Sequence, residues 1–140
     1  MTTCSNEAWN NLVLKSDPMT LPRGSSYRAA SLAALYMGLA NSGGINSFLT
    51  CTAELDAEEF VLALEQIGAS TAASELKRIV SGIGVPVLRS SREERWELLD
   101  RHWPSELNDL DLLSEESDSE LLDVLAAHVA ENQEYYLKLA

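Results

Sequence analysis

Capping residues and glycines divide this chain of 140 residues into short segments, most of which carry apolar residues three or four positions apart. This spacing places the apolar side chains on one face of a helix, which is then buried against other helices. Leucine and alanine dominate the apolar residues, whereas β-branched residues are sparse outside 79–87. Because these preferences favour helix over strand, the sequence predicts an all-helical fold, a single compact orthogonal bundle of about six or seven helices.

The bounds of the expected helices follow from start and stop signals. Serine or aspartate stands at most of the predicted N-termini, and Asp56 with Glu59, like Ser91 with Glu94, has the spacing of a capping box. Ser70 or Thr71 is the expected cap of the helix at about 70–81. Glycine or proline follows most of the predicted C-termini. Helices are therefore expected at about 5–15, 25–40, 45–49, 56–67, 70–81, 91–103 and 119–139, with 85–88 as a buried loop.

A chain of this length can bury a core without disulfides or metal ions. Residues 1–24 are expected to form an N-terminal helix and linker, and residues 25–140 the main helical domain. No stretch approaches the roughly 18–20 apolar residues that cross a bilayer, and the first ten residues lack the order of a signal peptide. The expected location is the cytoplasm.

The negative charge of the chain is concentrated in its last quarter. The formal net charge is -12; residues 1–105 hold twelve acids against nine bases, whereas residues 106–140 hold ten acids against Lys138 alone. Such a field repels nucleic acid and anionic membranes and attracts basic surfaces. A basic protein is therefore the expected partner, with no direct binding of nucleic acid or membrane.

Two groups of acidic residues are candidates for the contact with that partner. The first lies between positions 54 and 65 and contains no base, and here Glu54 and Glu58 are candidate partner-binding residues on an acidic surface. The second covers 106–134, where acids three or four positions apart, such as Glu116 and Glu120, would lie about 5–6 Å from each other on one helix face. Such rows approach the spacing of duplex phosphates, about 7 Å along one strand. The alternative interpretation is a solvated surface.

Other candidate sites have common structural explanations. The turn over 41–44, Asn-Ser-Gly-Gly, could bind an anion through successive backbone N–H groups, although glycines after a helix more often only permit a positive φ. Cys4 and Cys51 belong to no metal-binding motif and are expected to be free and buried thiols. A catalytic pair of Cys51 with His102 or His128 is the alternative.

Neither the tryptophans nor any motif of the sequence supports catalysis. Trp96 and Trp103 share helical spacing with Leu99 and are expected in the core, with a role as partner anchors, together with His102, as the alternative. The sequence contains no GxSxG, HExxH or P-loop motif. We therefore expect neither an enzyme nor a bound cofactor or metal.

The segment over 39–69 resembles a family of small acidic bacterial DNA-mimic proteins, whose domain was first catalogued as one of unknown function. That family pairs an NGGFxQFF motif with a downstream helix ending in IGA. The first motif is matched by Asn41, Gly43, Gly44, Ile45, Phe48 and Leu49, and the second by Leu64, Ile67, Gly68 and Ala69. Ser42 interrupts the Asn-Gly pair, Ser47 replaces the glutamine, and Ile45 and Leu49 replace aromatic residues. The general order of the family extends over about 27–139.

The resemblance implies an all-helical fold and, for the characterised member, a dimer whose acidic surface imitates duplex phosphates and occupies a DNA-binding protein. Some relatives are similar to immunity proteins encoded beside secreted toxins. The resemblance therefore implies a bacterial inhibitor of a protein partner, with a homodimer as one possibility.

We expect a non-enzymatic protein that inhibits a basic partner, first of all as a DNA mimic on a DNA-binding protein. An immunity protein that blocks a toxin is the second hypothesis. A small-ligand-binding or hydrolytic domain, using the turn over 41–44 and Cys51, is the third.

Overall fold

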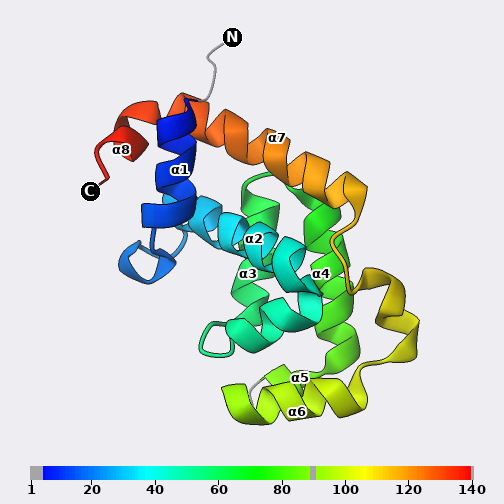
Figure 1. Cartoon of the computed structure of the whole chain (residues 1–140). Coiled ribbons are helices and arrows are strands. Elements are labelled where there is room, and N and C mark those ends of the chain that lie inside the picture. The colour runs from blue at the N-terminus through cyan, green and yellow to red at the C-terminus, as the bar shows by residue number, and fades with distance from the viewer. Residues whose placement is uncertain (1–4, 89–90, 140) are drawn as a thin grey trace.

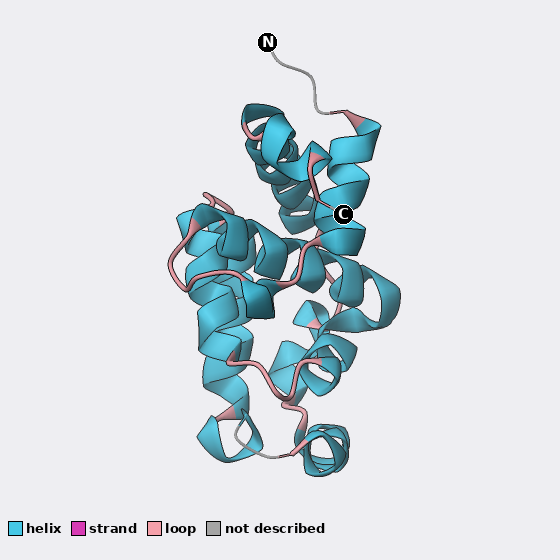
Figure 2. Cartoon of the chain, turned by 90° about the vertical axis from the view of Figure 1, so that its left-hand side faces the viewer, coloured by secondary structure: helices cyan, strands magenta, loops and turns pink. Residues whose placement is uncertain are grey.

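The computed structural model describes residues 5–88 and 91–139, except for the side chains of residues 85, 86, 102 and 109. Its helices are α1 (Asn6–Lys15), α2 (Ser26–Cys51), α3 (Ala57–Gln66), α4 (Ser70–Ile83), α5 (Val85–Leu88), α6 (Arg92–His102), α7 (Glu115–Glu131) and α8 (Gln133–Leu137), with 3-10 turns η1 (Pro18–Thr20) and η2 (Ser105–Leu110). Throughout this part of the chain the regular structure is helical (Figure 2). The predicted all-helical fold is confirmed.

Helix α2 is the centre of the molecule and runs across α3 and α4, while α7 lies along one edge and α6 at the opposite end (Figure 1). It packs against α1, α3, α6 and α7, so that side chains on most of its circumference are buried. Tyr36, Phe48 and Phe60 meet edge to face, with ring centroids 4.9 and 4.8 Å apart. This aromatic row joins α2 to α3 in the core.

Serine caps begin four of the helices, at Ser5, Ser25 and Ser91 as their spacing predicts and at Ser114 ahead of the predicted start near 119. In each case the serine side chain accepts the backbone N–H three residues later: Ser5 from Ala8, Ser25 from Arg28, Ser91 from Glu94 and Ser114 from Ser117. Asp56 caps α3 through the N–H of Glu58, but the Glu59 carboxylate binds Arg28 and does not close the predicted capping box.

The predicted interruption at 41–44 is confirmed, and it lies at Gly44. Gly44 alone leaves the helical conformation, with φ 86° and ψ 172°, and the helix resumes at once as far as Cys51. The two helices expected at 25–40 and 45–49 are therefore the two parts of one broken helix. A positive φ at Gly44 is a conformation that residues with a Cβ rarely adopt.

Three other boundaries differ from the predictions. The N-cap of α4 is Ala69, which offers no side-chain acceptor, so the expected caps Ser70 and Thr71 are wrong. Residues 85–88 form the short helix α5 where a loop was expected. The last predicted helix begins earlier, at Glu115, and is interrupted at Asn132, which has φ -124° and ψ 30°.

Helix α6 differs from the prediction at one position of its buried face. Leu99 is buried and Trp103 packs against the core, as expected, but Trp96 is 62% exposed. Arg95 is buried in the place expected for the tryptophan and is 1% exposed. Its guanidinium donates to the Leu49 carbonyl at 2.9 Å and to the Leu88 carbonyl. Both carbonyls lie at helix C-termini, where acceptors lack intrahelical partners.

Helix α1 packs against α8, far away in the sequence (Figure 1). The amide of Asn11 donates to the Tyr136 carbonyl at 2.7 Å, and the backbone N–H of Ser5 donates to Gln133 Oε1 at 3.2 Å.

Over the residues that are described, none of the helices combines the length and the hydropathy that a membrane span requires.

Candidate functional site

The acidic residues of the C-terminal quarter fall into two sets that the sequence does not distinguish. One set accepts hydrogen bonds from the rest of the protein and holds α7 in place. The other set is exposed and has no partner among the described residues. The internal contacts determine which carboxylates remain available to a binding partner.

Glu120 of α7 supplies the cap that α4 lacks. Its carboxylate accepts the backbone N–H of Thr71 at 3.0 Å and that of Ala72 at 3.2 Å. The first N–H groups of a helix have no intrahelical acceptor and carry the positive end of the helix dipole. A carboxylate in this position therefore stabilises α4 and joins it to α7.

Asp111 performs the same function at the break in α2. Its backbone carbonyl accepts the N–H of Ile45 at 2.5 Å, and its carboxylate accepts that of Asn46 at 3.1 Å. The two N–H groups that open the second part of α2 are thus already occupied by an anionic residue of the same chain. The anion-binding site hypothesised at 41–44 has these donors satisfied from within the protein.

Two further contacts fasten the start of α7. Glu75 of α4 accepts the hydroxyls of Ser114 at 2.7 Å and Ser117 at 2.8 Å. Asp118 accepts the side-chain amide of Asn41 at 2.9 Å. Together with Glu120 and Asp111, these carboxylates explain part of the acidic composition by the architecture of the fold.

The exposed carboxylates of α7 and α8 form what we call the C-terminal acidic surface, which consists of Glu115, Glu116, Asp123, Glu131 and Glu134. All five are exposed, and none has an ion pair or a side-chain hydrogen bond within the described part of the chain. On α7, Glu116 and Asp123 lie opposite the buried stripe of Ser117, Leu121, Leu125 and Val129, and Glu115 and Glu131 flank it. The surface is therefore carried by a rigid helix whose other side is anchored in the core.

The two candidate residues of the earlier acidic group have different surroundings. Glu54 is exposed and forms an ion pair of 2.7 Å with Arg92, which also donates to the Cys51 carbonyl at 3.1 Å. Glu58 is exposed in the first turn of α3 and has no ion pair among the described residues. Glu58 therefore offers a free carboxylate, whereas the charge of Glu54 is already balanced.

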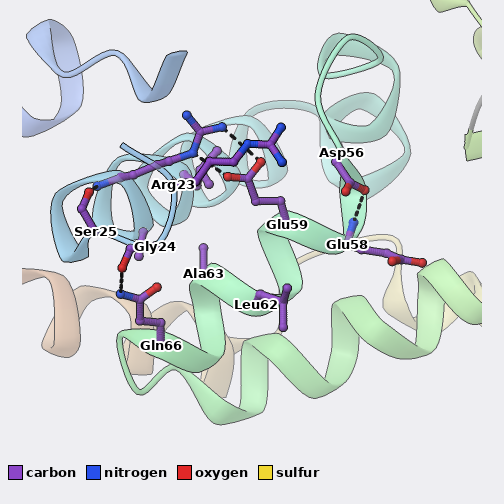
Figure 3. A pocket seen from close by; sticks show the side chains of 12 residues that line it. Arg23, Gly24, Ser25, Asp56, Glu58, Glu59, Leu62, Ala63 and Gln66 are labelled. Atoms are coloured by element: carbon purple, nitrogen blue, oxygen red, sulfur yellow. Dashed lines mark hydrogen bonds and ion pairs between the residues drawn. The ribbon is translucent and has the colours of Figure 1, made fainter. Parts of the chain in front are cut away.

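Glu58 lies at the rim of a cavity of about 350 Å³ between the start of α2 and α3 (Figure 3). Leu62, which is 63% exposed, and the buried Ala63 contribute apolar walls, and Arg23 contributes a positive charge. The Gln66 amide donates to the Gly24 carbonyl at 2.9 Å and closes one side (Figure 3). The mixed charges of this cavity favour no single class of ligand.

An ion pair between Arg28 and Glu59 also lines this cavity. Arg28 Nε lies 2.5 Å from Glu59 Oε1, and Arg28 Nη2 lies 3.1 Å from Glu59 Oε2. The same guanidinium donates to the carbonyls of Pro18 at 2.6 Å and Leu21 at 3.0 Å. The hydrogen bond from Arg28 lowers the pKa of Glu59, although burial acts in the opposite direction. The pair is a structural clamp of η1, α2 and α3.

The alternative catalytic pair of Cys51 with His128 does not assemble. Cys51 is exposed at the last position of α2, which corrects the expectation of a buried thiol, and Cys4 lies outside the described residues. His128 contacts Tyr27, near the first position of α2, with ring centroids 5.8 Å apart. The part of α2 before the break at Gly44 spans roughly 25 Å and the part after it only roughly 10 Å, so Cys51 is not in contact with His128. The His102 side chain is not among those described. Within the described part of the chain, no group of three or more His, Cys, Asp or Glu could hold a metal ion.

An aromatic cluster at the junction of α7 and α8 was missed by the sequence analysis. His128 Nε2 lies 2.7 Å from the Tyr136 hydroxyl, and Tyr27 stacks on Tyr135 with ring centroids 4.0 Å apart. Burial lowers the pKa of His128, and Glu131 offsets part of this effect. Burial also raises the pKa of Tyr136. The adjacent Tyr135 and Tyr136 were a visible signal, but their partner Tyr27 is more than 100 positions earlier.

The comparisons with known proteins yield one match. Residues 23–132 match the family of DMP19-like proteins, and this range contains α2 to α7 with both internal carboxylate caps. No curated protein and no solved structure matches the chain significantly. Because the match covers well over half of the sequence, the chain belongs to the DMP19-like protein family.

Proposed function

We propose that the C-terminal acidic surface binds the DNA-binding face of a basic protein and thereby keeps that protein from duplex DNA. The observation that carries this proposal is the set of five exposed carboxylates on α7 and α8 without a basic partner among the described residues. Membership of the DMP19-like family and the resemblance to acidic DNA mimics agree with it. The proposed role is binding without catalysis.

The contrast between α6 and α7 favours a binding role over a solvated surface. A surface that only needs solubility intersperses charges of both signs. Helix α6 has this pattern, and there Arg101 pairs with Glu97 at 2.5 Å while Arg92 pairs with Glu54. Helix α7 carries no lysine or arginine. Unbalanced carboxylates repel one another, and a basic partner would relieve this repulsion.

The spacing of the carboxylates limits how closely they imitate a duplex. Because Glu120 is used to cap α4, the exposed acids that follow the adjacent pair Glu115 and Glu116 along α7 are seven and eight positions apart, at Asp123 and Glu131. A rise of 1.5 Å per residue places them about 10–12 Å apart along the axis. Phosphates of one strand rise 3.4 Å each, so roughly every third phosphate has a counterpart. We therefore propose mimicry of the field of a duplex, with fewer charges than DNA itself.

Affinity capture with two matched variants tests the proposal. In the first variant, the five acids of the C-terminal acidic surface are replaced by Gln or Asn. In the second, the same number of charges is removed elsewhere, at Glu7, Glu65, Glu93, Glu94 and Asp100, which are exposed. The wild type and the second variant should capture a DNA-binding protein from the native host lysate, and duplex DNA and moderate salt should release it. The first variant should not capture this protein.

Equal capture by both variants would contradict the assignment of the surface. Capture of a toxin domain that resists salt would support the immunity hypothesis instead, because a plug of an active site depends on a few buried contacts. Both outcomes can be told apart from mimicry by the salt concentration that releases the captured protein.

A further inference from the structure

A second cavity, of about 510 Å³, lies where α7 ends and α8 begins. Its walls combine aromatic rings with carboxylates, from Tyr27, Tyr135, Glu131 and Glu134, and Asn132 lies between them. Lys138 is the one base among its described walls. Two acids of the C-terminal acidic surface thus border a hollow, whereas Glu116 and Asp123 do not line it.

The aromatic wall of this cavity is held in a fixed geometry. The rings of Tyr27 and Tyr135 stack with centroids 4.0 Å apart and planes inclined by 29°. The Tyr27 hydroxyl donates to Asn132 Oδ1 at 3.0 Å, and the Asn132 amide donates to the His128 carbonyl at 2.8 Å. Tyr135 also meets the buried Tyr136 edge to face at 5.0 Å. A preorganised aromatic wall attracts cations through the electron-rich faces of its rings.

The electrostatics of the cavity also favour a cation. Glu131 and Glu134 are exposed and have no partner among the described side chains. Helix α7, with 17 residues, ends here, and the C-terminus of a helix carries the negative end of its dipole. Burial lowers the pKa of the neighbouring His128, so that its ring is neutral at neutral pH and adds no opposing charge. Lys138 is the one described positive group that opposes a bound cation.

We propose that this cavity holds the guanidinium group of an arginine side chain presented by the basic partner. A guanidinium stacks on an aromatic ring and pairs with carboxylates through its planar fork of donors, whereas an ammonium is a point charge with a strong hydration shell. The cavity therefore discriminates arginine from lysine, which the rest of the C-terminal acidic surface does not. Only the source of the arginine rests on the function proposed above.

Titration with two small probes, followed by amide chemical shifts in NMR spectra, tests this inference directly. N-acetyl-arginine amide should shift the amides of Tyr27 and of residues 130–135 and bind more tightly than N-acetyl-lysine amide, by about two- to fivefold. Replacing Glu131 and Glu134 by Gln should remove this preference. Glu116→Gln with Asp123→Asn removes the same charge from α7 and should retain it. Lys138→Gln should strengthen the binding of arginine, a gain that damage to the fold cannot produce.

Equal binding of both probes, or shift changes spread evenly along α7, would overturn the inference. Tyr135→Leu should abolish the preference for arginine and Tyr135→Phe should restore it, since phenylalanine keeps the ring. If the lysate yields no DNA-binding partner while the arginine preference is measured, the proposed function fails and the cavity assignment holds. If the partner is captured but the probes do not differ, the cavity assignment alone fails.

Discussion

Arg95 and Trp96 exchange the positions that their side chains usually take, since the arginine is buried and the tryptophan is exposed. The sequence pattern of α6 contained the correct stripe, because Leu99 and Trp103 pack on the core as predicted. Arg95 and Trp96 are adjacent in the sequence, so either could occupy the third buried position of α6, and hydrophobicity favours the tryptophan. The arginine is buried because it donates to the carbonyls of Leu49 and Leu88, which lack partners within their own helices. Both carbonyls belong to other helices, so the sequence of α6 does not reveal them.

The clamp between Arg28 and Glu59 makes the stability of the protein depend on pH. Because Arg28 lowers the pKa of Glu59 in the folded state, the stabilisation is fully present above the ordinary glutamate pKa of 4.5 and is lost as the pH falls through the lowered value. We expect Glu59→Gln to reduce the free energy of unfolding by about 1–3 kcal/mol at pH 7. Urea denaturation at pH 7 and at successively lower pH should show this difference disappearing.

Glu65→Gln is the control for this prediction, since Glu65 lies on the same helix, is exposed and has no ion pair among the described residues. It should change the pH dependence little. A difference between Glu59→Gln and the wild type that stayed constant down to pH 2 would show that the carboxylate charge is not the cause.

At the scale of the elements, the serine caps and the glycine positions located most helices, and the errors were a helix that resumes after its break and a missing cap. The glycines at 43 and 44 predict an interruption, because helices usually end at such residues, but they do not predict that the chain returns to helix at once. Here Asp111 accepts the N–H groups that a break exposes, so the helix continues beyond Gly44. Glu120 likewise replaces the side-chain cap of α4. Both acceptors are distant in the sequence, and local capping rules cannot find them.

Two alanine substitutions in α2 should have opposite effects. Gly44 has φ 86°, and an added Cβ would lie 3.0 Å from the Asp111 carbonyl oxygen, so Gly44→Ala should destabilise the protein by about 2 kcal/mol or more. Gly38 is exposed within the same helix, and a Cβ there meets nothing within 4 Å. Gly38→Ala should therefore stabilise it by up to about 1 kcal/mol. Thermal denaturation of the two variants beside the wild type measures both effects, and stabilisation by Gly44→Ala would refute the described break.

The division of the acids into internal and exposed sets predicts unequal effects of two neighbouring substitutions on α7. Glu120→Gln weakens the cap of α4 and should destabilise the protein by about 1 kcal/mol. Asp123→Asn removes the same charge from an exposed position without a described partner and should leave stability unchanged or slightly higher. Chemical denaturation distinguishes the two, and equal effects would argue against a capping role for Glu120.

For the whole molecule, the sequence predicted the fold class and the charge, but it did not show which carboxylates are free. Glu54, chosen from the sequence as a binding residue, is paired with Arg92, which stands 38 positions later. The cavity of Tyr27 and Tyr135 likewise joins residues from near opposite ends of the described chain. A candidate site built from such distant segments becomes visible only when the helices are placed in space.

The unbalanced charge should make the intact protein more stable in salt. With a formal net charge of -12 and three ion pairs among the described residues, screening should relieve more repulsion than attraction. Between about 20 and 300 mM NaCl we expect a gain on the order of 1 kcal/mol, or roughly 4 °C in melting temperature. Calorimetry at several salt concentrations measures this shift, and a falling melting temperature would show that attractive pairs dominate.

The pairing of α1 with α8 has a consequence for how the protein is made. The hydrogen bond from Asn11 to Tyr136 joins residues 125 positions apart, so α1 leaves the ribosome well before its partner exists. Chains are synthesised at about 5–20 residues per second, which leaves α1 without α8 for roughly 6–25 s. During that interval the buried face of α1, with Ala8 and Leu12, remains uncovered by α8. Until α8 has been synthesised this pairing is missing, and the nascent chain presents an apolar helix face of the kind that chaperones shield.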